Sequence, residues 1–202
     1  MEQHAIKRYT AEEFFAIPED GIKRELIDGI IYVNGQPIDH RPLGMAGCSP
    51  AHQVALREIS GQLWLFLKGK RCQVFTSPLD IQLNLDFEDN TIVEPDIVVI
   101  CDVSKFDGRI YKGIPDFVVE ILSPSTARLD RQIKMRRYER AGIREYWLVD
   151  PIARTVQAHL LFNGKYKKTS YSSDDEAAPI MVLENCTINL AEVFAEVDEL
   201  GA

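Results

Sequence analysis

The sequence predicts an α/β fold, in which a mixed β-sheet core is flanked by α-helices and followed by a C-terminal β-hairpin. Segments rich in Val and Ile alternate with two amphipathic helical segments, which is typical of a sheet covered by helices. The chain has 202 residues, of which 46% are hydrophobic and 27% charged, as in an ordinary globular domain with a substantial core. We therefore expect a single domain over residues 1–202.

The first predicted elements are a short helix and a hairpin. The segment Thr10-Ala-Glu-Glu13 has the spacing of a capping box and predicts a short helix that ends near Ile17. Two short apolar runs within Arg24–Val33 surround Asp28-Gly29, a pair that favours a type I′ turn. The next stretch, Asp39–Ser49, is rich in Pro and Gly and is expected to form a surface loop.

The middle of the chain is predicted to alternate between helices and strands. Ser49-Pro50 begins a long amphipathic helix that runs to the neighbourhood of Lys68. Ser123-Pro-Ser-Thr126 is a helix-start signal, and this second helix should continue to Ala141 before Gly142 ends it. The predicted strands are Cys72–Thr76, Leu79–Leu85, Ile92–Cys101, Asp116–Leu122 and Tyr146–Val149, and the last three are expected in the central sheet.

The last quarter is predicted to form a hairpin and a short helix. Val156–Phe162 and Tyr166–Tyr171 flank Asn163-Gly164, the strongest short hairpin signal in the chain. Leu190–Phe194 is expected to be a short terminal helix.

Composition narrows the compartment and the kind of site. No apolar run approaches the roughly 20 residues that cross a bilayer, and a secretory signal is absent, so we expect a cytoplasmic protein without a membrane partner. Four widely spaced cysteines fit neither a zinc site nor a dense disulfide framework, and four reduced, mostly buried thiols are expected. Because the histidines form no cluster, a metal here would have oxygen ligands.

Charge is unevenly distributed along the chain. The net charge of −8 argues against a protein that coats nucleic acid through bulk electrostatics. The segment Ala127–Arg144 nevertheless carries seven basic residues against Asp130 and Glu139, a net charge of +5. It indicates either one face for an anionic partner or the solvated surface of a helix, which is the commoner explanation. The basic residues are Arg128, Arg131, Lys134, Arg136, Arg137, Arg140 and Arg144.

Two carboxylates, Asp96 and Glu120, lie in segments that otherwise have the composition of core strands. Period-2 alternation places each on an apolar face of its strand, where an unpaired ionised carboxylate is costly and needs compensation. Either acid alone is better explained by a buried salt bridge or a strand-end cap. The two together, on sequential buried strands and followed by a basic helix, favour a site for Mg²⁺ or Mn²⁺.

Lys134 is the third candidate residue. At about 100° per residue it shares a helix face with Tyr138 and Ala141, which are predicted to face the core, so its ammonium should point inward. The alternative is an i,i+4 ion pair with Asp130, one turn earlier, worth only tenths of a kcal/mol. Helical spacing favours neither explanation over the other.

Several motifs occur together along the chain. They are Arg24-Glu-Leu-Ile-Asp-Gly29, Ser49-Pro-Ala-His52, Glu94-Pro-Asp96, Val119-Glu-Ile-Leu-Ser-Pro-Ser-Thr126, then Asp130, Lys134, Tyr138 and Gly142, and finally Glu145-Tyr-Trp-Leu-Val-Asp-Pro151. Together they resemble the Uma family of putative restriction endonucleases, which belongs to the PD-(D/E)XK nuclease superfamily. The resemblance spans nearly the whole chain, and the combination is much more specific than any single motif.

The resemblance implies a restriction-endonuclease-like fold with a Mg²⁺ (or Mn²⁺) site. Asp96 matches the Asp of the family's Pro-Asp motif and Glu120 its second acid, so both would bind the metal. Glu25 matches an additional acid, suited to bind the metal or to hold water. The sequence departs from the superfamily signature at Leu122, where a lysine is expected. Lys134, on the following helix, is the candidate substitute.

The implied activity is metal-dependent hydrolysis of phosphodiester bonds in DNA, in a homodimer by analogy with restriction enzymes. The expected catalytic residues are Glu25, Asp96, Glu120 and Lys134, with Lys134 positioning water or stabilising developing charge. The expected nucleic-acid contacts are Ser123 and Ser125 at the helix start, and Arg128 and Arg131 on the flanking backbone. His52 is more simply a capping or packing residue, and Asp80 a strand-end acid near the cleft.

Two other functions stay open. Because Leu122 cannot donate a hydrogen bond, the same fold could serve as a nucleic-acid or protein binding module without turnover. The acidic site is also suited to the hydrolysis of another phosphate or nucleotide ester.

Overall fold

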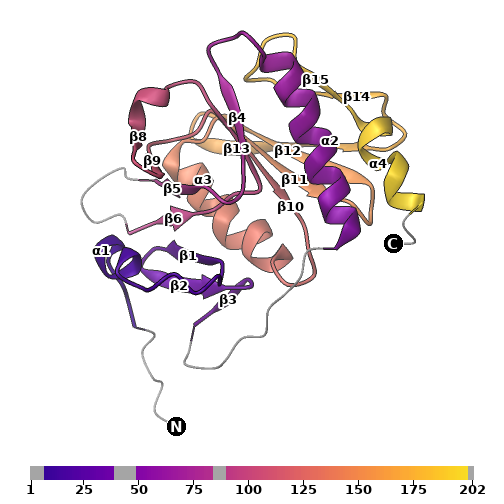
Figure 1. Cartoon of the computed structure of the whole chain (residues 1–202). Helices are drawn as coiled ribbons and strands as arrows, with labels where there is room; N and C mark the ends of the chain where they lie inside the picture. Colours follow the sequence, from indigo (N-terminus) through magenta and orange to yellow (C-terminus); the bar gives the residue numbers. More distant parts are fainter. Residues whose placement is uncertain (1–6, 39–48, 84–89, 200–202) are drawn as a thin grey trace.

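The structure, a computed structural model, describes residues 7–38, 49–83 and 90–199 (Figure 1). Two β-sheets of six and seven strands, a small third sheet and several helices form the fold, so the predicted α/β class is confirmed. The predicted loop Asp39–Ser49 lies outside the described residues except for Ser49.

The six-stranded sheet is the predicted mixed sheet. Its strands are β4 (Gln73–Thr76), β7 (Ile97–Ile100), β10 (Phe117–Ile121), β11 (Glu145–Asp150), β12 (Thr155–Phe162) and β13 (Lys165–Ser172). They are ordered β13-β12-β11-β10-β7-β4. Neighbours β10 and β11 are parallel, and the other neighbouring pairs are antiparallel.

The seven-stranded sheet gathers shorter strands from the first half of the chain. Its strands are β1 (Arg24–Ile27), β2 (Ile30–Val33), β3 (Gln36–Pro37), β5 (Asp80–Gln82), β6 (Ile92–Val93), β8 (Phe106–Asp107) and β9 (Ile110–Lys112). They are ordered β3-β2-β1-β6-β5-β9-β8. The third sheet pairs β14 (Ala177–Pro179) with β15 (Thr187–Asn189).

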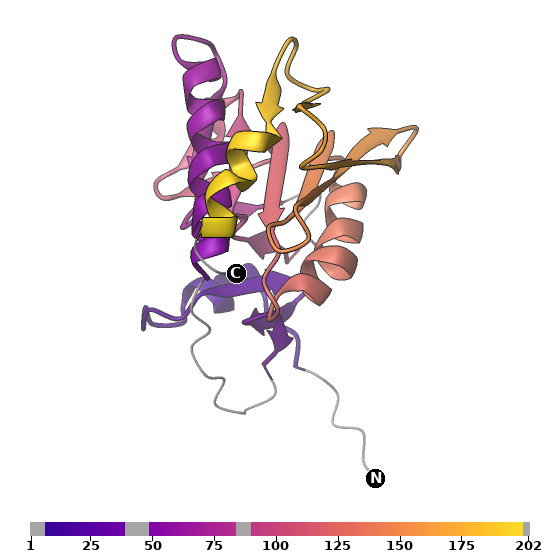
Figure 2. The same ribbon diagram turned by 90° about the vertical axis from the view of Figure 1, so that its right-hand side faces the viewer.

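Helices cover both faces of the six-stranded sheet. The helices that cover it are α2 (Pro50–Leu67), α3 (Met135–Ala141) and α4 (Leu190–Glu199). The helix α1 (Ala11–Phe15) packs against strands of the seven-stranded sheet, and η1 (Val103–Lys105) is a 3₁₀ helix. Figure 2 shows α2 and α4 on one face and α3 on the other. Trp147 belongs to the core under α2 and α4, and Tyr138 and Tyr146 to the core under α3. No helix among the described residues is long and apolar enough to span a membrane.

Elements with strong local signals form as predicted. The capping box of α1 is present, because Thr10 Oγ1 accepts the Glu13 N–H over 3.1 Å and Glu13 Oε2 accepts the Thr10 N–H over 2.9 Å. Both hairpin turns adopt the positive φ angles that a type I′ turn requires. These are 49° and 80° at Asp28-Gly29, and 50° and 75° at Asn163-Gly164.

The predicted strand Ile92–Cys101 is in fact two strands in different sheets. Strand β6 belongs to the seven-stranded sheet and β7 to the six-stranded sheet, and Glu94-Pro95-Asp96 connects them. Pro95 has no N–H for a ladder hydrogen bond, so the break falls there. The chain crosses between the sheets again at Ser77-Pro78, between β4 and β5. The Ser77 N–H donates to the Asp96 carbonyl over 3.0 Å, so the two crossings lie side by side.

The second long helix begins with a π-helical segment, η2 (Leu129–Lys134), and continues as α3. It ends as predicted at Gly142, which has a φ of 86°. The expected helix up to Ala141 is therefore present, and its first half is π-helical. Such π-helical segments are rare and often occur at functional sites. Lys134 is the last residue of this segment.

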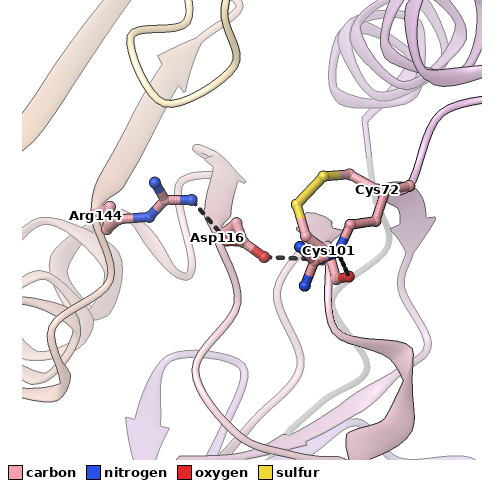
Figure 3. Close-up of a disulfide and its surroundings, with 5 residues drawn as sticks. Cys72, Cys101, Asp116 and Arg144 are labelled. Carbon is pink, nitrogen blue, oxygen red and sulfur yellow. Dashed lines mark hydrogen bonds and ion pairs between the residues drawn. A yellow bond between two sulfur atoms is a disulfide. The ribbon is translucent and has the colours of Figure 1, made fainter.

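The expectation of four reduced thiols is wrong for two of the cysteines. Cys72 and Cys101 form a disulfide beside the β4–β7 pair (Figure 3). Since the register aligns Gln73 with Ile100, the two cysteines face each other at the next position, a proximity that sequence spacing does not reveal. Cys186 is a buried free thiol, as expected, and Cys48 lies outside the described residues.

Polar contacts anchor the disulfide to the neighbouring strands. Asp116, just before β10, accepts the Cys101 N–H over 2.8 Å and Arg144 Nη2 over 2.6 Å (Figure 3). Arg71 Nε donates to the Cys101 carbonyl over 3.0 Å. These bonds tie the end of β7 to the segments that lead into β10 and β11.

Candidate active site

A cavity of about 230 Å³ lies beside Asp96, where the chain crosses between the two sheets. Segments far apart in the sequence line it: the start of β1, the turn between β2 and β3, the start of α2, and the stretch from β10 to η2. Its charged or ionisable lining residues are Lys23, Glu25, Tyr32, His52, Asp96, Glu120, Asp130 and Lys134. Its other lining residues are Asn34, Gly35, Ser123, Ser125 and Thr126.

Asp96 and Glu120 lie opposite each other on neighbouring strands. The register pairs Ile97 with Val119, so Asp96 and Glu120 occupy the next position along β7 and β10. Asp96 Oδ2 accepts the Ile121 N–H over 2.8 Å, which fixes its carboxylate against β10. Both acids line the cavity, so they share one side of the sheet.

Two nitrogen groups flank the Asp96 carboxylate. His52 Nε2 lies 3.3 Å from Asp96 Oδ2, and Lys23 Nζ lies 4.0 Å from Asp96 Oδ1. Burial raises the pKa of Asp96, but the hydrogen bond from His52 and the charge of Lys23 outweigh it, so the pKa is lowered. Asp96 is therefore a carboxylate at neutral pH.

The ammonium of Lys134 lies among three acids. Its Nζ is 2.7 Å from Glu25 Oε1 and 3.8 Å from Asp130 Oδ1, and it forms a close ion pair with Glu120 Oε1. The side chain is only 2% exposed. Burial lowers the pKa of Lys134, yet the charges of Glu120, Glu25 and Asp130 outweigh this effect and raise it well above its usual value. Lys134 is thus a buried, permanently charged group.

The acids outnumber this buried cation. Burial raises the pKa of Glu120 well above its usual value, and the charges of Asp130, Asp96 and Glu25 add to the effect of burial while Lys134 opposes it. The Tyr138 hydroxyl donates to Glu120 Oε1 over 2.8 Å. Burial likewise raises the pKa of Asp130 to about 6. Burial and the neighbouring acids therefore favour the protonated forms of Glu120 and Asp130, and a further cation close to them would favour the ionised forms instead.

Sequence reasoning missed Lys23 and gave little weight to His52. Lys23 precedes β1 and has the sequence context of an ordinary surface lysine, yet its Nζ lies 3.3 Å from Glu94 Oε1. Burial lowers the pKa of Lys23, but the charges of Glu25, Asp96 and Glu94 have the larger effect and raise it. His52 is more than a capping or packing residue, because its ring contacts Asp96 and its Nδ1 is buried without a hydrogen-bond partner among the described residues.

Asp80, expected near the cleft, begins β5 and is partly buried. Burial raises its pKa, and the charges of Glu94 and Glu25 raise it further. It is not among the described residues that line the cavity. Asp80 therefore contributes charge to the surroundings of the site without facing the cavity.

The turn before η2 brings hydroxyl groups to the cavity. Ser123 Oγ lies 3.0 Å from the hydroxyl oxygens of both Ser125 and Thr126. The Asn34-Gly35 turn packs directly against this segment, since a Cβ at Gly35 would lie 2.3 Å from the Ser125 carbonyl oxygen. The predicted contact residues Ser123 and Ser125 thus line the same cavity as the acids.

The predicted arginines lie outside this lining. Arg131 Nη2 is 3.0 Å from Asp150 Oδ2, whereas Arg128 is exposed and has no acidic partner among the described residues. Most of the basic segment is neutralised in the same way as Arg131. Lys134 pairs with Glu120, and Arg144 pairs with Asp116. Arg137 and Arg140 both pair with Asp28. Five of the seven basic residues are therefore paired with acids, and a face for an anionic partner stays a prediction.

The expected convergence of Glu25, Asp96 and Glu120 on one ion is not found. Within the described part of the chain, no three acidic, histidine or cysteine side chains are placed to hold one metal ion. Glu25 Oε1 is occupied by Lys134 and by the Glu94 N–H, at 2.7 and 2.9 Å. The remaining donor set, Asp96 and Glu120, still suits Mg²⁺, which binds one or two carboxylates and completes its shell with water and phosphate oxygens.

Leu122 cannot supply the lysine of the superfamily signature. It is 7% exposed and packs in the core under α3. The structure instead brings the ammonium of Lys134 to Glu120 from η2. A lysine is therefore present beside the second acid, although it comes from a different element.

Comparisons with known proteins identify the family and a similar fold. The family model of Uma2, described as "Putative restriction endonuclease", matches residues 11–191. An uncharacterised protein of Synechocystis sp. (strain ATCC 27184 / PCC 6803 / Kazusa) is 30% identical over 155 residues, which are 76% of this chain and 74% of that protein. A crystal structure titled as a putative nuclease belonging to DUF820 from Anabaena variabilis ATCC 29413 has a similar fold. Its TM-score is 0.70 and its identity 19%, over 93% of this chain and 98% of that one. This chain, with its paired acids in a mixed sheet and its matching motifs, belongs to the Uma2 family of putative restriction endonucleases.

Proposed function

We propose that this protein is a metal-dependent endonuclease that hydrolyses phosphodiester bonds in DNA. The observation that carries the proposal is the opposed pair of acids, Asp96 and Glu120, in one cavity with a buried lysine. Paired carboxylates beside a cation suit the stabilisation of charge on a phosphate and on an attacking water. The family membership supports the same reaction class.

Asp96 and Glu120 would hold Mg²⁺ or Mn²⁺. When bound, the ion would lower the pKa of a coordinated water and neutralise charge on the phosphate. Asp96 is suited to this task because its lowered pKa keeps it ionised and the Ile121 N–H fixes its orientation. Because Glu120 Oε1 is paired with Lys134 and the Tyr138 hydroxyl, the other oxygen of Glu120 would bind the ion. We propose that Glu25 contributes indirectly, through its ion pair with Lys134.

Lys134 would act by holding the acids in place. Its ion pairs with Glu25 and Glu120 join β1 of one sheet to β10 of the other. At the cavity wall, the hydroxyls of Ser123 and Ser125 are suited to donate hydrogen bonds to a phosphate oxygen. Arg128, exposed and without an acidic partner among the described residues, would contact the nucleic-acid backbone further out.

Cutting both strands of duplex DNA requires two active sites, so we further propose that the protein works as a homodimer. A DNA substrate also agrees with a cytoplasmic location, whereas the Cys72–Cys101 disulfide is unusual in that compartment.

A binding module without turnover is the second candidate. It is favoured by the pairing of Lys134 with Glu25 and Glu120, which partly neutralises the acids without any metal. In such a protein the cavity would bind a phosphate group without hydrolysing it.

Supercoiled plasmid DNA would distinguish the two functions. We expect the purified protein to nick or linearise plasmid with Mg²⁺ or Mn²⁺ and not with EDTA. Asp96→Asn should abolish cutting and keep DNA binding, whereas Asp174→Asn, at an exposed position outside the cavity lining, should cut like the native protein. Nucleic-acid binding without cleavage of duplex DNA, single-stranded DNA or RNA would contradict the nuclease and support the binding module.

A further inference from the structure

Two lysines line the cavity within the described residues, and they differ in what they can touch. The side chain of Lys134 is 2% exposed, whereas that of Lys23 is 45% exposed. We propose that Lys23 is the cation that contacts the phosphate of the nucleic acid, while Lys134 serves as a positioning residue for the acids. This inference rests on the proposed function, because it assumes that the cavity receives a phosphodiester.

The contacts of Lys134 leave its ammonium little capacity for a ligand. An ammonium has three N–H donors. Glu25 and Glu120 lie within hydrogen-bond distance, and Asp130 Oδ1 lies 3.8 Å away. A phosphate that reached this nitrogen would displace a carboxylate and bury its own charge. Contact between Lys134 and substrate is therefore disfavoured.

The contacts of Lys23 are longer and more open. Its Nζ lies 3.3 Å from Glu94 Oε1, 4.0 Å from Asp96 Oδ1 and 3.5 Å from Ser77 Oγ. Glu94 Oε1 also accepts the Ser77 hydroxyl over 2.8 Å, so the loss of Lys23 would leave this carboxylate with a partner. Lys23 can therefore turn towards an incoming phosphate without leaving a buried acid unpaired.

The position of Lys23 also matches an electrostatic need. A phosphate that approaches Asp96 meets the negative charges of Asp96 and Glu94, which repel it. Lys23 lies on the Oδ1 side of Asp96, away from Oδ2, which accepts the Ile121 N–H and faces His52. Its charge would thus offset the repulsion at the Oδ1 side of Asp96.

Salt-dependent DNA binding tests this assignment. The full-length protein would be titrated into a fluorescein-labelled DNA duplex in EDTA, at 50 to 300 mM KCl, and binding followed by fluorescence anisotropy. Each phosphate contact contributes about 0.9 to the slope of log affinity against log salt concentration on duplex DNA. We expect Lys23→Met to reduce that slope by about one and to weaken binding roughly eightfold at 0.1 M salt. Lys23→Arg, which keeps the charge, should retain most of the salt slope and most of the DNA affinity.

Lys112→Met is the matched control. Lys112 is 47% exposed and pairs with one acid, Asp107, but it does not line the cavity. The Lys112→Met variant should bind DNA with the same affinity and the same salt slope as the native protein. An unchanged slope in Lys23→Met would overturn the inference while leaving the nuclease proposal intact if plasmid is still cut. Binding that depends on Lys23 without any cleavage would instead contradict the nuclease and leave the phosphate contact standing. A native protein that binds no nucleic acid would contradict both.

Discussion

Lys134 Nζ lies 2.7 Å from Glu25 Oε1, so an ammonium from η2 is paired with a carboxylate on β1 of the seven-stranded sheet. The same nitrogen pairs with Glu120 on β10 of the six-stranded sheet. One buried side chain therefore links the two sheets at the cavity. Its loss should affect both the stability of the fold and the arrangement of the acids.

Lys134→Met should lower the free energy of unfolding by about 3–5 kcal/mol at neutral pH, because it leaves buried carboxylates without their cation. Urea denaturation would measure the change. The double variant Glu25→Gln/Lys134→Met should recover part of the loss, since it also removes one of the unpaired charges. Native-like stability of Lys134→Met at pH 7 would show that the ion pairs contribute little. We also expect any cleavage activity of Lys134→Met to fall by orders of magnitude.

Asp130 should make stability depend on pH between about 4 and 6. Burial raises its pKa from 3.8 to about 6, so in this range the folded protein binds more protons at this site than the unfolded chain does. The contribution of Asp130 to stability therefore falls as pH rises through the window and is constant above it. In Asp130→Asn, the decline of unfolding free energy between pH 4 and 6 should be shallower. An identical pH profile would contradict the assignment.

Gly35→Ala should destabilise the protein more than the same change at Gly164. Both glycines have similar positive φ angles, 72° and 75°, so an alanine is strained by a similar amount at each. At Gly35 the new Cβ would also meet the Ser125 carbonyl oxygen at 2.3 Å, whereas nothing lies within 4 Å at Gly164. We expect an additional loss of about 1–3 kcal/mol for Gly35→Ala, measured by thermal denaturation. Equal losses would mean that the neighbouring turn moves away without cost.

Removal of the disulfide should lower stability without altering the cavity. Cys72 and Cys101 are 29 residues apart, and a crosslink over such a loop stabilises a fold by roughly 3 kcal/mol. Cys72→Ser/Cys101→Ser should melt at a lower temperature, and reducing agent should bring the native protein to the same value. Reducing agent should leave the double variant unchanged. A native melting temperature insensitive to complete reduction would contradict this expectation.

Arg128 and Arg131 should contribute unequally to DNA binding. Arg131 is paired with Asp150, whereas Arg128 is exposed and lacks an acidic partner in the described part of the chain. Arg128→Met should therefore lower the salt slope of DNA binding by about one, and Arg131→Met should lower it less. Anisotropy titrations over a range of KCl concentrations would measure both. A larger effect of Arg131→Met would mean that its pair with Asp150 opens when nucleic acid binds.

The sequence predicted the elements whose signals are local. The capping box at Thr10 and the turns at Asp28-Gly29 and Asn163-Gly164 each depend on a few adjacent residues, and each formed as expected. Helical spacing left two explanations of Lys134 open, an inward direction or an ion pair with Asp130. The structure shows a buried Lys134 whose Nζ lies 3.8 Å from Asp130 Oδ1. Its catalytic role stays a prediction.

The features that sequence reasoning missed depend on contacts between distant segments. The apolar run around Glu94-Pro95-Asp96 has the composition of one strand, and only the pairing of its two halves with different sheets shows the break. The Cys72–Cys101 pair and the approach of Lys23 to Glu94 likewise require the tertiary fold. A pattern of residue types alone contains no information on these distances.

The crossing at Glu94-Pro95-Asp96 has a mechanical consequence. Glu25 belongs to one sheet and Glu120 to the other, and Asp96 lies in the joint between them. A change in the angle between the sheets would change the distance between Glu25 and Glu120, while Asp96 lies at the connection between the sheets. The ion pairs of Lys134 with both glutamates oppose such a change. The spacing of the acids is therefore a readout of how the two sheets are set against each other.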